Sequence, residues 1–409
     1  MHPIRLAVFT AILGTLANVG LYVTRDPGVT NALARAEVTQ GQGFVDVAAG
    51  STHTCAVGAS GGVWCWGEGG SGQLGHGSFQ TSRTPVPVVG LPGPAVSVAV
   101  GGNTSCAALE NGALFCWGSS ASGQIGLPNT TPATAIARRI EGLGYVHSVA
   151  IGSDYACAGT TDGATSCWGE LRVPKGKGIF LETHLRPRAL PDAPFLTNLV
   201  AGGGHVCGVT LEHATWCWGG ADMGAMGQDD GRPLKAALAP HSMDLPTPAK
   251  LLAAGGAHSC ALGAEGDLWC WGKGSAFRAD LLGGNVDTNT TPLRVGQAPL
   301  ATAIAAGDDS VCLLLMGGKV GCIGAESPGV WVPFEAAVPS LDRIDARGKR
   351  LCGLDAAGQA WCAPLTGATA FAEPPMSPGQ WRPDNGLSAR WNRLVGTWAH
   401  LAIASADAS

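Results

Sequence analysis

The stretch HTCAVGASGGVWCWG, from His53 to Gly67, holds the pattern that decides the fold. Its two cysteines enclose nine residues, and this arrangement occurs seven times and uses all 14 cysteines of the 409-residue chain. The first cysteines of successive pairs stand 40 to 53 residues apart. A repeated unit of this length predicts a propeller, a solenoid or an array of modules. The pairs are Cys55 with Cys65, Cys106 with Cys116, Cys157 with Cys167, Cys207 with Cys217, Cys260 with Cys270, Cys312 with Cys322, and Cys352 with Cys362.

Each cysteine pair has a tight turn at its centre. Glycine holds the sixth position after the first cysteine in six of the seven units, and His213 holds it in the fourth. A three-residue hairpin loop built on a type I turn needs a residue with positive φ at its third position, which glycine supplies without steric cost. This register places the two cysteines opposite each other, within reach of a disulfide after modest adjustment. The glycines are Gly61, Gly112, Gly163, Gly266, Gly318 and Gly358.

The sequence allows three interpretations of the cysteines: seven disulfides, zinc sites with four thiolates, or free buried thiols. Zinc ligands usually come from turns with two to four residues between cysteines, and the sequence contains no such spacing. The apolar stretch from Leu6 to Thr24, described below, is typical of an export segment. Export favours disulfides, because they persist in oxidising compartments.

The strand that follows each turn has large residues on one face and a cysteine on the other. In Val63-Trp64-Cys65-Trp66-Gly67, the two tryptophans share a face because side chains alternate along a strand. Both faces of such a strand must be buried, which suits a sheet packed between two neighbouring sheets in a propeller. We therefore assign eight tryptophans to packing between blades: Trp64, Trp66, Trp117, Trp168, Trp216, Trp218, Trp269 and Trp271.

Several motifs of the unit resemble the regulator of chromosome condensation repeat. In the first unit they are Gly50 to Val57, Trp66-Gly67, Gly72-Gln73-Leu74-Gly75 and Thr84-Pro85. The second unit repeats them, the fifth keeps part of them, and the sixth and seventh lack Trp-Gly. The resemblance implies an all-β, seven-bladed β-propeller over about Phe44 to Ile403. Gly396 to Ile403 looks like the first strand of a further unit, and we expect it to help close the ring.

The chain begins with a segment typical of export. Arg5 precedes a charge-free stretch from Leu6 to Thr24, whose length lies between that of a signal peptide and that of a membrane span. We expect residues 1–36 to be a signal peptide cleaved before Glu37, or an uncleaved anchor that makes the only membrane contact. Residues 37–409 would form the propeller. The predicted location is secreted, periplasmic or at the cell surface.

Composition and motifs argue against several functions. The net charge of −5 provides no broad basic surface, so nucleic acid binding is disfavoured. There is no nucleophile elbow or phosphate-binding loop, and we predict no catalytic residue, no metal and no cofactor. Asp229-Asp230-Gly231 lacks the alternating oxygen ligands of a calcium loop and is interpreted as a turn. His53, His205 and His258 recur at one framework position and are interpreted as structural hydrogen-bonding residues.

Two segments between hairpins are the most irregular, residues 170–195 and 223–248, and both are candidate recognition loops. We expect a monomer that binds an unidentified protein through its loops, by analogy with secreted propeller-type β-lactamase inhibitors. One alternative is a lectin-like propeller that stacks sugar rings on exposed tryptophans. Another, less favoured, is a protein resembling the guanine-nucleotide exchange factors of the family. The candidate binding residues are Lys175, Lys177, Arg186, Arg188, Trp331 and Trp381.

Overall fold

The computed structural model describes residues 43–127, 132–175, 178–220, 224–227, 240–273, 288–298, 300–324, 332–333 and 340–365. The chain divides into two units, Met1–Glu37 and Val38–Ser409, and every described residue belongs to the second. This part consists of strands and turns. It contains no helix that is long and apolar enough to cross a membrane.

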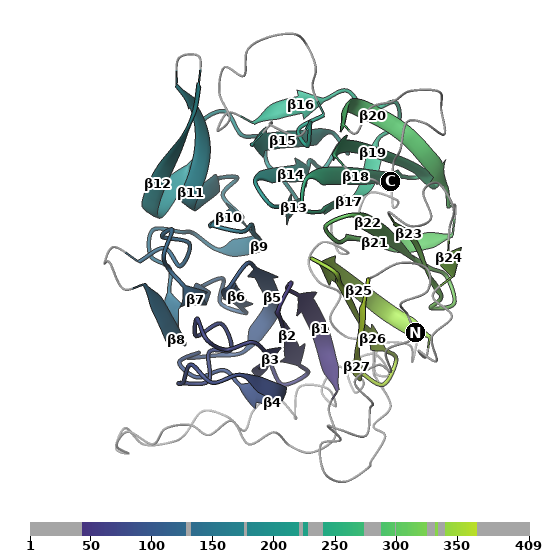
Figure 1. The fold of residues 1–409 in the computed structure, drawn as a ribbon. Helices are drawn as coiled ribbons and strands as arrows, with labels where there is room; N and C mark the ends of the chain where they lie inside the picture. The colour runs from purple at the N-terminus through teal and green to yellow at the C-terminus, as the bar shows by residue number, and fades with distance from the viewer. Residues whose placement is uncertain are drawn as a thin grey trace, which may run out of the picture. The chain divides into compact units, whose positions relative to one another are not determined.

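The strands form seven antiparallel sheets, which are the seven blades of a β-propeller (Figure 1). Blade 1 contains β1 (Phe44–Ala49), β2 (His53–Gly58), β3 (Val63–Gly67) and β4 (Ser82–Pro87); blade 2 contains β5 (Ala95–Gly101), β6 (Thr104–Leu109), β7 (Leu114–Ser119) and β8 (Ala133–Arg139); blade 3 contains β9 (Val146–Ile151), β10 (Tyr155–Thr160), β11 (Thr165–Lys175) and β12 (Gly178–Ala189); blade 4 contains β13 (Asn198–Ala201), β14 (His205–Val209), β15 (Thr215–Gly219) and β16 (His241–Met243).

The remaining three blades follow the same order along the chain. Blade 5 contains β17 (Ala249–Ala254), β18 (His258–Gly263), β19 (Asp267–Lys273) and β20 (Thr288–Gln297); blade 6 contains β21 (Ala301–Ala306), β22 (Ser310–Leu315), β23 (Val320–Gly324) and β24 (Val332–Pro333); blade 7 contains β25 (Leu341–Arg347), β26 (Arg350–Asp355) and β27 (Ala360–Pro364). The first strand of each blade contacts the first strand of the next, and β25 contacts β1. The first strands therefore line the centre of the ring.

The turn between the second and third strands confirms the prediction from the glycine pattern. All six predicted glycines have positive φ, between 70° and 93°, and His213 adopts φ 62° at the same position. The cysteines of each pair lie directly opposite each other in the register, for example Cys55 opposite Cys65. The turn therefore fixes the pairing within each hairpin.

All seven cysteine pairs are disulfides, with Cα atoms 4.0 to 4.1 Å apart, and no cysteine is free. Among the three alternatives, the structure selects the disulfides over zinc sites and free thiols. Every cysteine is buried except Cys362, which is half-buried in the last strand of blade 7. The bridges join Cys55 with Cys65, Cys106 with Cys116, Cys157 with Cys167, Cys207 with Cys217, Cys260 with Cys270, Cys312 with Cys322, and Cys352 with Cys362.

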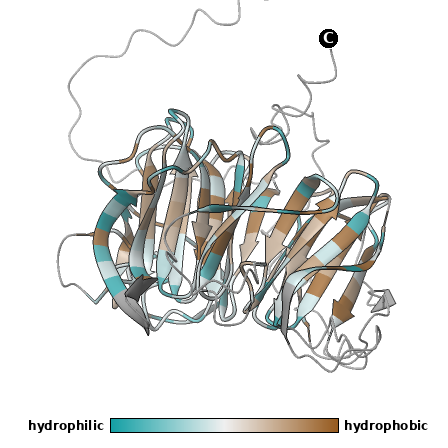
Figure 2. Cartoon of the chain, turned by 90° about the horizontal axis from the view of Figure 1, so that it is seen from above, coloured by the Kyte–Doolittle hydropathy of each residue, from teal (hydrophilic) through white to brown (hydrophobic). Residues whose placement is uncertain are grey.

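Blades pack against one another through the two faces of these hairpins. The disulfide of one blade and the tryptophan of the next lie in the same apolar cluster: Cys55 and Cys65 with Trp117, Cys106 and Cys116 with Trp168, Cys157 and Cys167 with Trp218, and Cys207 and Cys217 with Trp271. Ile323 takes the place of tryptophan against Cys260 and Cys270 of blade 5. Figure 2 shows apolar residues concentrated in the packed strands. The predicted sandwich of strands between neighbouring blades is confirmed.

The ring closes by direct packing of blade 1 on blade 7. Trp66 shares an apolar cluster with Cys352 and Leu354, and Cys362 packs against this cluster from its half-buried position. Phe44 N–H donates to Gly358 O at 2.8 Å. Blade 7 has three strands within the described residues. The predicted closing strand, residues 396–403, lies outside them and stays a prediction.

Candidate functional site

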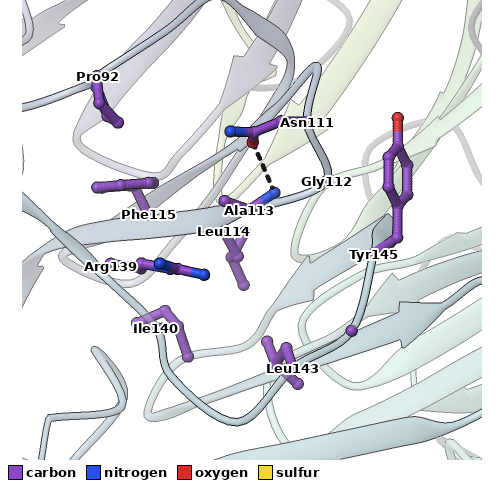
Figure 3. Close-up of a pocket in the computed structure, with 11 residues that line it drawn as sticks. Pro92, Asn111, Gly112, Ala113, Leu114, Phe115, Arg139, Ile140, Leu143 and Tyr145 are labelled. Atoms are coloured by element: carbon purple, nitrogen blue, oxygen red, sulfur yellow. Dashed lines mark hydrogen bonds between the residues drawn. The ribbon is translucent and has the colours of Figure 1, made fainter.

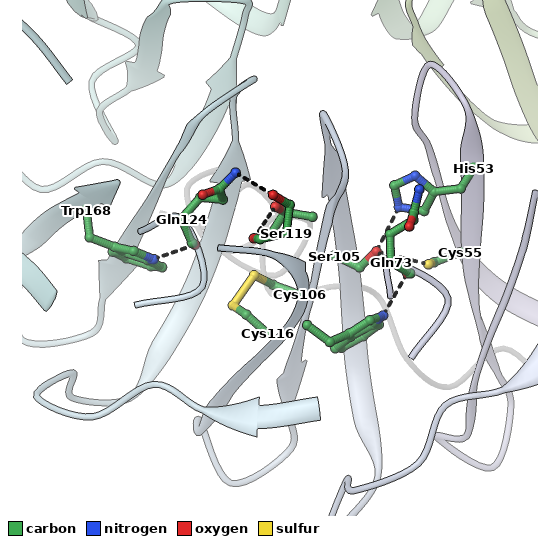
Figure 4. Close-up of a disulfide and its surroundings, with 11 residues drawn as sticks. His53, Cys55, Gln73, Ser105, Cys106, Cys116, Ser119, Gln124 and Trp168 are labelled. Atoms are coloured by element: carbon green, nitrogen blue, oxygen red, sulfur yellow. Dashed lines mark hydrogen bonds between the residues drawn. A yellow bond between two sulfur atoms is a disulfide. The ribbon is translucent and has the colours of Figure 1, made fainter. Parts of the chain in front are cut away.

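His53 and His205, two of the recurring histidines, join neighbouring blades from buried positions. His53 Nε2 lies 2.8 Å from Ser105 Oγ in blade 2, and that hydroxyl donates to the Gln73 carbonyl of blade 1 at 2.9 Å (Figure 4). His205 Nε2 makes the equivalent contact with Ser259 Oγ in blade 5 at 2.7 Å. These contacts give both histidines a structural hydrogen-bonding role.

Burial keeps these imidazoles neutral. Burial, together with the charge of Arg350, lowers the pKa of His53 to about 3. Burial lowers the pKa of His205 to about 3, with smaller effects of His258 and Arg347. Burial also lowers the pKa of His258 to about 4. Neutral, enclosed imidazoles with these partners support framework packing.

Three tryptophans, each in the third strand of its blade, add hydrogen bonds to the packing between blades. Trp117 Nε1 donates to Gln73 O at 2.9 Å, and Trp168 Nε1 donates to Gln124 O at 2.8 Å. Both acceptors belong to the Gly-Gln-Leu/Ile-Gly loop of the preceding blade. Trp271 Nε1 makes the same contact with the carbonyl of residue 225 at 2.8 Å. These three side chains are fully buried and have no role in binding at the surface.

One charged side chain crosses the centre of the ring. Arg347, in the first strand of blade 7, donates to Ile151 O of blade 3 at 2.9 Å and to Ala201 O of blade 4 at 2.7 Å. Its second guanidinium nitrogen donates to Gly202 O at 3.1 Å. The guanidinium thus ties blade 7 to the blades on the far side of the ring, and its bonds to backbone carbonyls make it a structural cation.

Two carboxylates near Arg347 join blade 7, blade 1 and blade 2. Asp345 accepts the Ala49 N–H at 2.7 Å, while Asp46 accepts the Val98 N–H at 3.1 Å and pairs with Arg343 at 3.0 Å. Burial raises the pKa of Asp345 to about 6, and it also raises the pKa of Asp46. These carboxylates satisfy backbone groups at the seam where the ring closes.

A shallow hollow of about 270 Å³ lies beside the hairpin turn of blade 2 (Figure 3). Leu114, Ile140 and Leu143 line it, with the exposed Arg139 at its margin and Tyr145 at one end. The Tyr145 hydroxyl donates to a backbone carbonyl, that of residue 110, at 2.7 Å. The described lining holds one charged group and no acid-base pair, which gives the hollow no catalytic arrangement.

The structure places two of the predicted binding residues on an extended hairpin. Within the segment 170–195, expected to be irregular, residues 170–175 belong to β11 and residues 178–189 to β12, and the two strands pair from Glu170↔Thr183 to Lys175↔Gly178. Arg186 and Arg188 lie on β12, the outermost strand of blade 3, and both are exposed. Periodicity alone did not reveal these strands because Pro174, Gly176 and Gly178 interrupt the pattern.

Polar side chains of β12 form a small exposed cluster. Arg188 Nη1 lies 3.7 Å from Glu182 Oε1 and 3.3 Å from His184 Nε2. The exposed fraction of the Arg188 side chain is 61%. Arg186 has no acidic partner among the described residues, so the hairpin presents positive charge to solvent.

The side chains of the other predicted binding residues lie outside the described part of the chain. Lys175 lies in β11, but its side chain is outside the description, as is Lys177. Trp331 and Trp381, which carry the carbohydrate hypothesis, also lie outside the described residues, as does Asp229-Asp230-Gly231. Their roles stay predictions.

Comparisons with known proteins agree with this geometry. Models of the regulator of chromosome condensation (RCC1) repeat match residues 60–108, and residues 44–73, 95–124 and 249–276. The human E3 ubiquitin-protein ligase HERC2 is 32% identical over 164 residues, which are 38% of this chain and 3% of the ligase. The ultraviolet-B receptor UVR8 of Arabidopsis thaliana is 29% identical over 264 residues, which are 62% of this chain and 58% of the receptor. The chain therefore spans a small part of the ligase and somewhat more than half of the receptor.

Solved structures show the same fold at low sequence identity. Human WBSCR16 superposes with a TM-score of 0.65 at 18% identity, over 78% of this chain and 88% of WBSCR16. Yeast RCC1 (Prp20), solved with Kap60, gives a TM-score of 0.65 at 18% identity, over 85% of each chain. The chain therefore carries RCC1 repeats and folds as a seven-bladed β-propeller similar to RCC1 structures, with a disulfide in every blade.

Proposed function

We propose that this protein is an exported, non-enzymatic scaffold that binds another protein through the outer parts of its propeller. The observation that carries the proposal is the set of seven disulfides, one in each blade. Disulfides persist in oxidising compartments and are rare in the cytosol. A disulfide in every blade therefore supports a function outside the cytosol.

Protein binding is supported by what the similar propellers are described as doing. One yeast structure shows RCC1 (Prp20) bound to Kap60, and another report describes binding of Prp20p to Gsp1p and histones. The cross-blade bonds of His53, Trp117 and Arg347 make this chain a rigid support for surface segments. Rigid scaffolds with variable outer segments are a common basis for recognition.

The first test is the intact mass of the protein isolated from its native host, before and after reduction and alkylation. We expect a non-reduced mass about 14 Da below that of the reduced chain, because seven bridges remove one hydrogen from each of 14 cysteines. We also expect no alkylation before reduction, and a mass that shows whether residues 1–36 are absent. Fourteen alkylatable thiols on a full-length chain would overturn export.

The second test is retention of partners on the immobilised, disulfide-intact protein. Secreted and cell-envelope proteins of the host are passed over it, and each retained protein is purified and its affinity measured. We expect at least one specific complex with a defined dissociation constant. Failure of every purified candidate to bind would contradict the scaffold function.

A further inference from the structure

The exposed apolar side chains of the described residues gather at one end of the blades, which we call the turn face. The first strand of a blade starts where its second strand ends, as Phe44↔Gly58 shows in blade 1, so the turns between second and third strands lie at this end. Six of the ten large apolar side chains that are exposed in the described residues lie in these turns or within three residues of the start of a first strand. Apolar residues exposed together on one face mark an interaction surface. They are Val96, Tyr145, Phe195, Leu211, Leu300 and Met316.

Two aromatic residues of the turn face are held in place by their neighbours. The Tyr145 hydroxyl donates to the Glu110 carbonyl at 2.7 Å, and the ring packs so closely on the turn of blade 2 that a Cβ on Gly112 would have no room. Phe195 lies beside His147, with ring centroids 5.3 Å apart. The exposed fractions of Tyr145 and Phe195 are nevertheless 39% and 38%. Rings that are both fixed and exposed lose little conformational entropy when a partner covers them.

The hollow of about 270 Å³ opens beside Tyr145 on this face. The buried Leu114 and Ile140 line it together with the half-buried Leu143. Figure 3 shows Arg139 and Tyr145 on opposite sides of Leu114. Pockets for small molecules have volumes of about 300 Å³ or more, so the hollow better suits a single side chain of a partner protein. Side chains that fill such pockets, arginine among them, contribute much of the affinity of protein interfaces.

Carboxylates outnumber cations around the hollow. Glu110 and Asp162 are exposed in the turns of blades 2 and 3, and a Cβ on Gly144, which lines the hollow, would be 3.3 Å from Asp162 Oδ2. The Glu141 side chain is 78% exposed, and its Oε1 lies 3.8 Å from Nε of Arg139, the one cation among the lining residues. Three carboxylates and one guanidinium leave an excess of negative charge. This excess favours a basic partner.

We propose that the turn face of blades 2 and 3 binds a basic segment of a partner protein, and that one arginine side chain of this segment enters the hollow beside Tyr145. The arginine methylene groups pack on Leu114 and Leu143, and the guanidinium stacks on the Tyr145 ring, whose face attracts cations. Glu110 and Asp162 contact further basic residues of the segment. This inference names the surface and the chemistry of the partner for the scaffold function proposed above, on which it rests.

The test uses a fluorescein-labelled peptide of about ten residues in which lysine and serine alternate around one central arginine. Fluorescence anisotropy measures its binding to the disulfide-intact protein. Two further peptides replace the arginine by citrulline, which has nearly the same shape without the charge, or by alanine. We expect citrulline to weaken binding by about fivefold or more, because the attraction of the ring for the cation is lost. Alanine also removes the methylene groups, so we expect a loss of about tenfold or more.

Two variants of Tyr145 test the contribution of the ring. Tyr145→Phe keeps the ring and loses the hydrogen bond to Glu110, whereas Tyr145→Leu loses the ring and keeps an apolar side chain. We expect Tyr145→Phe to bind the arginine peptide within about threefold of the wild type. We expect Tyr145→Leu to bind the arginine and citrulline peptides about equally, because the aromatic face is gone.

The double variant with Glu110→Lys and Glu141→Lys tests the contribution of charge. The matched control carries Glu265→Lys and Asp342→Lys, two exposed acidic residues at the same end of blades 5 and 7. Both variants change the charge by the same amount. We expect the first to weaken binding by about tenfold or more and the control by less than about threefold. Intact mass and circular dichroism verify that every variant keeps the disulfides and the fold.

Three results would overturn the proposal: no binding of the arginine peptide by the wild type, equal binding of the citrulline peptide, or equal losses in the two double variants. Sedimentation velocity tests for a second copy as the occupant. A dimer that dissociates in the Glu110→Lys, Glu141→Lys variant would assign the face to self-association and also overturn the proposal.

The failure of this inference can be told apart from that of the scaffold function. A purified natural partner that binds the Glu110→Lys, Glu141→Lys variant as tightly as the wild type would overturn the inference and leave the scaffold function intact. If the scaffold function itself is wrong, the wild type binds no natural partner, whatever the peptides do.

Discussion

His213 adopts φ 62° at the turn position that glycine holds in the other six blades. A residue with a Cβ in this left-handed region costs about 1 kcal/mol relative to glycine. The imidazole Nδ1 lies 3.2 Å from Ala249 O, so replacing it changes a side-chain contact as well as the backbone. Two variants that both lack the imidazole separate these effects.

We predict that His213→Gly unfolds at a higher guanidinium concentration than His213→Ala, by about 1 kcal/mol in the free energy of unfolding. Denaturation of both proteins with disulfides intact measures the difference. Equal stabilities would mean that the turn relaxes out of the left-handed region when the side chain is shortened.

Asp345 gives a second prediction at the residue scale, because its pKa in the folded state is about 6 and its ordinary value is 3.8. A carboxyl whose pKa is raised by folding contributes stability below pH 3.8 that is lost as the pH rises through 6. Asp46, Arg343 and Arg347 surround this seam, so their charges also affect the titration. The asparagine variant removes the titration of this group alone.

We predict that the stability of the wild type relative to Asp345→Asn falls by up to about 3 kcal/mol between about pH 4 and about pH 7. Guanidinium denaturation of both proteins at several pH values measures it. A difference that does not change with pH would show that the group keeps its ordinary pKa.

At the scale of the element, a buried tryptophan in the third strand of a blade packs against the disulfide of the preceding blade. Gln73 O accepts hydrogen bonds from both Trp117 Nε1 and Ser105 Oγ, whereas among the described residues Gln124 O accepts only from Trp168 Nε1. Ala156 occupies the position in blade 3 that Ser105 occupies in blade 2. Removing the indole N–H of Trp168 therefore leaves the buried Gln124 carbonyl without a donor from the described residues, whereas the Gln73 carbonyl keeps Ser105 Oγ as a donor when Trp117 is replaced.

We predict that Trp168→Phe costs about 1 kcal/mol more stability than Trp117→Phe, because only the first change leaves an unsatisfied buried acceptor. Both changes remove a similar volume, so the comparison cancels most of the packing loss. Chemical denaturation supplies the two free energies. Equal losses would mean that a water molecule replaces the donor at Gln124, and the reverse order would contradict the prediction.

At the scale of the whole molecule, Arg347 replaces a glycine of the repeat and joins distant blades. It stands five residues before Cys352, and glycine stands at this position in the other six blades, as Gly50, Gly101, Gly152, Gly202, Gly255 and Gly307. A comparison of the repeats alone would favour glycine here. The structure shows that its guanidinium bonds three carbonyls of blades 3 and 4.

We predict that Arg347→Gly, although it restores the repeat, lowers the free energy of unfolding by about 2 kcal/mol, because hydrogen bonds to a charged group are lost. Hydrogen exchange should rise at β9, β13 and β25, where the donor and its acceptors lie. A gain in stability on substitution, with unchanged exchange, would refute the role of Arg347 across the ring.

Much of the fold was predictable because the same sequence pattern occurs in seven successive units. The cysteine spacing, the turn glycines and the alternation in Val63–Gly67 are local patterns, and local geometry suffices to pair Cys55 with Cys65 and to turn Trp66 away from the disulfide. The structural role of His53 was also predictable, since a residue that recurs in a framework is more often packed than catalytic.

By itself, the sequence determined that seven units recur, and it determined the hairpin register and which cysteines lie opposite each other, because the register depends only on residues within one unit. Only the tertiary structure decided what lies between units, such as Arg347 reaching across the ring and Asp345 at the seam. These features depend on which segments meet in space, and contacts between residues as far apart as 196 positions, such as Arg347 with Ile151, leave no periodic signal in a single sequence.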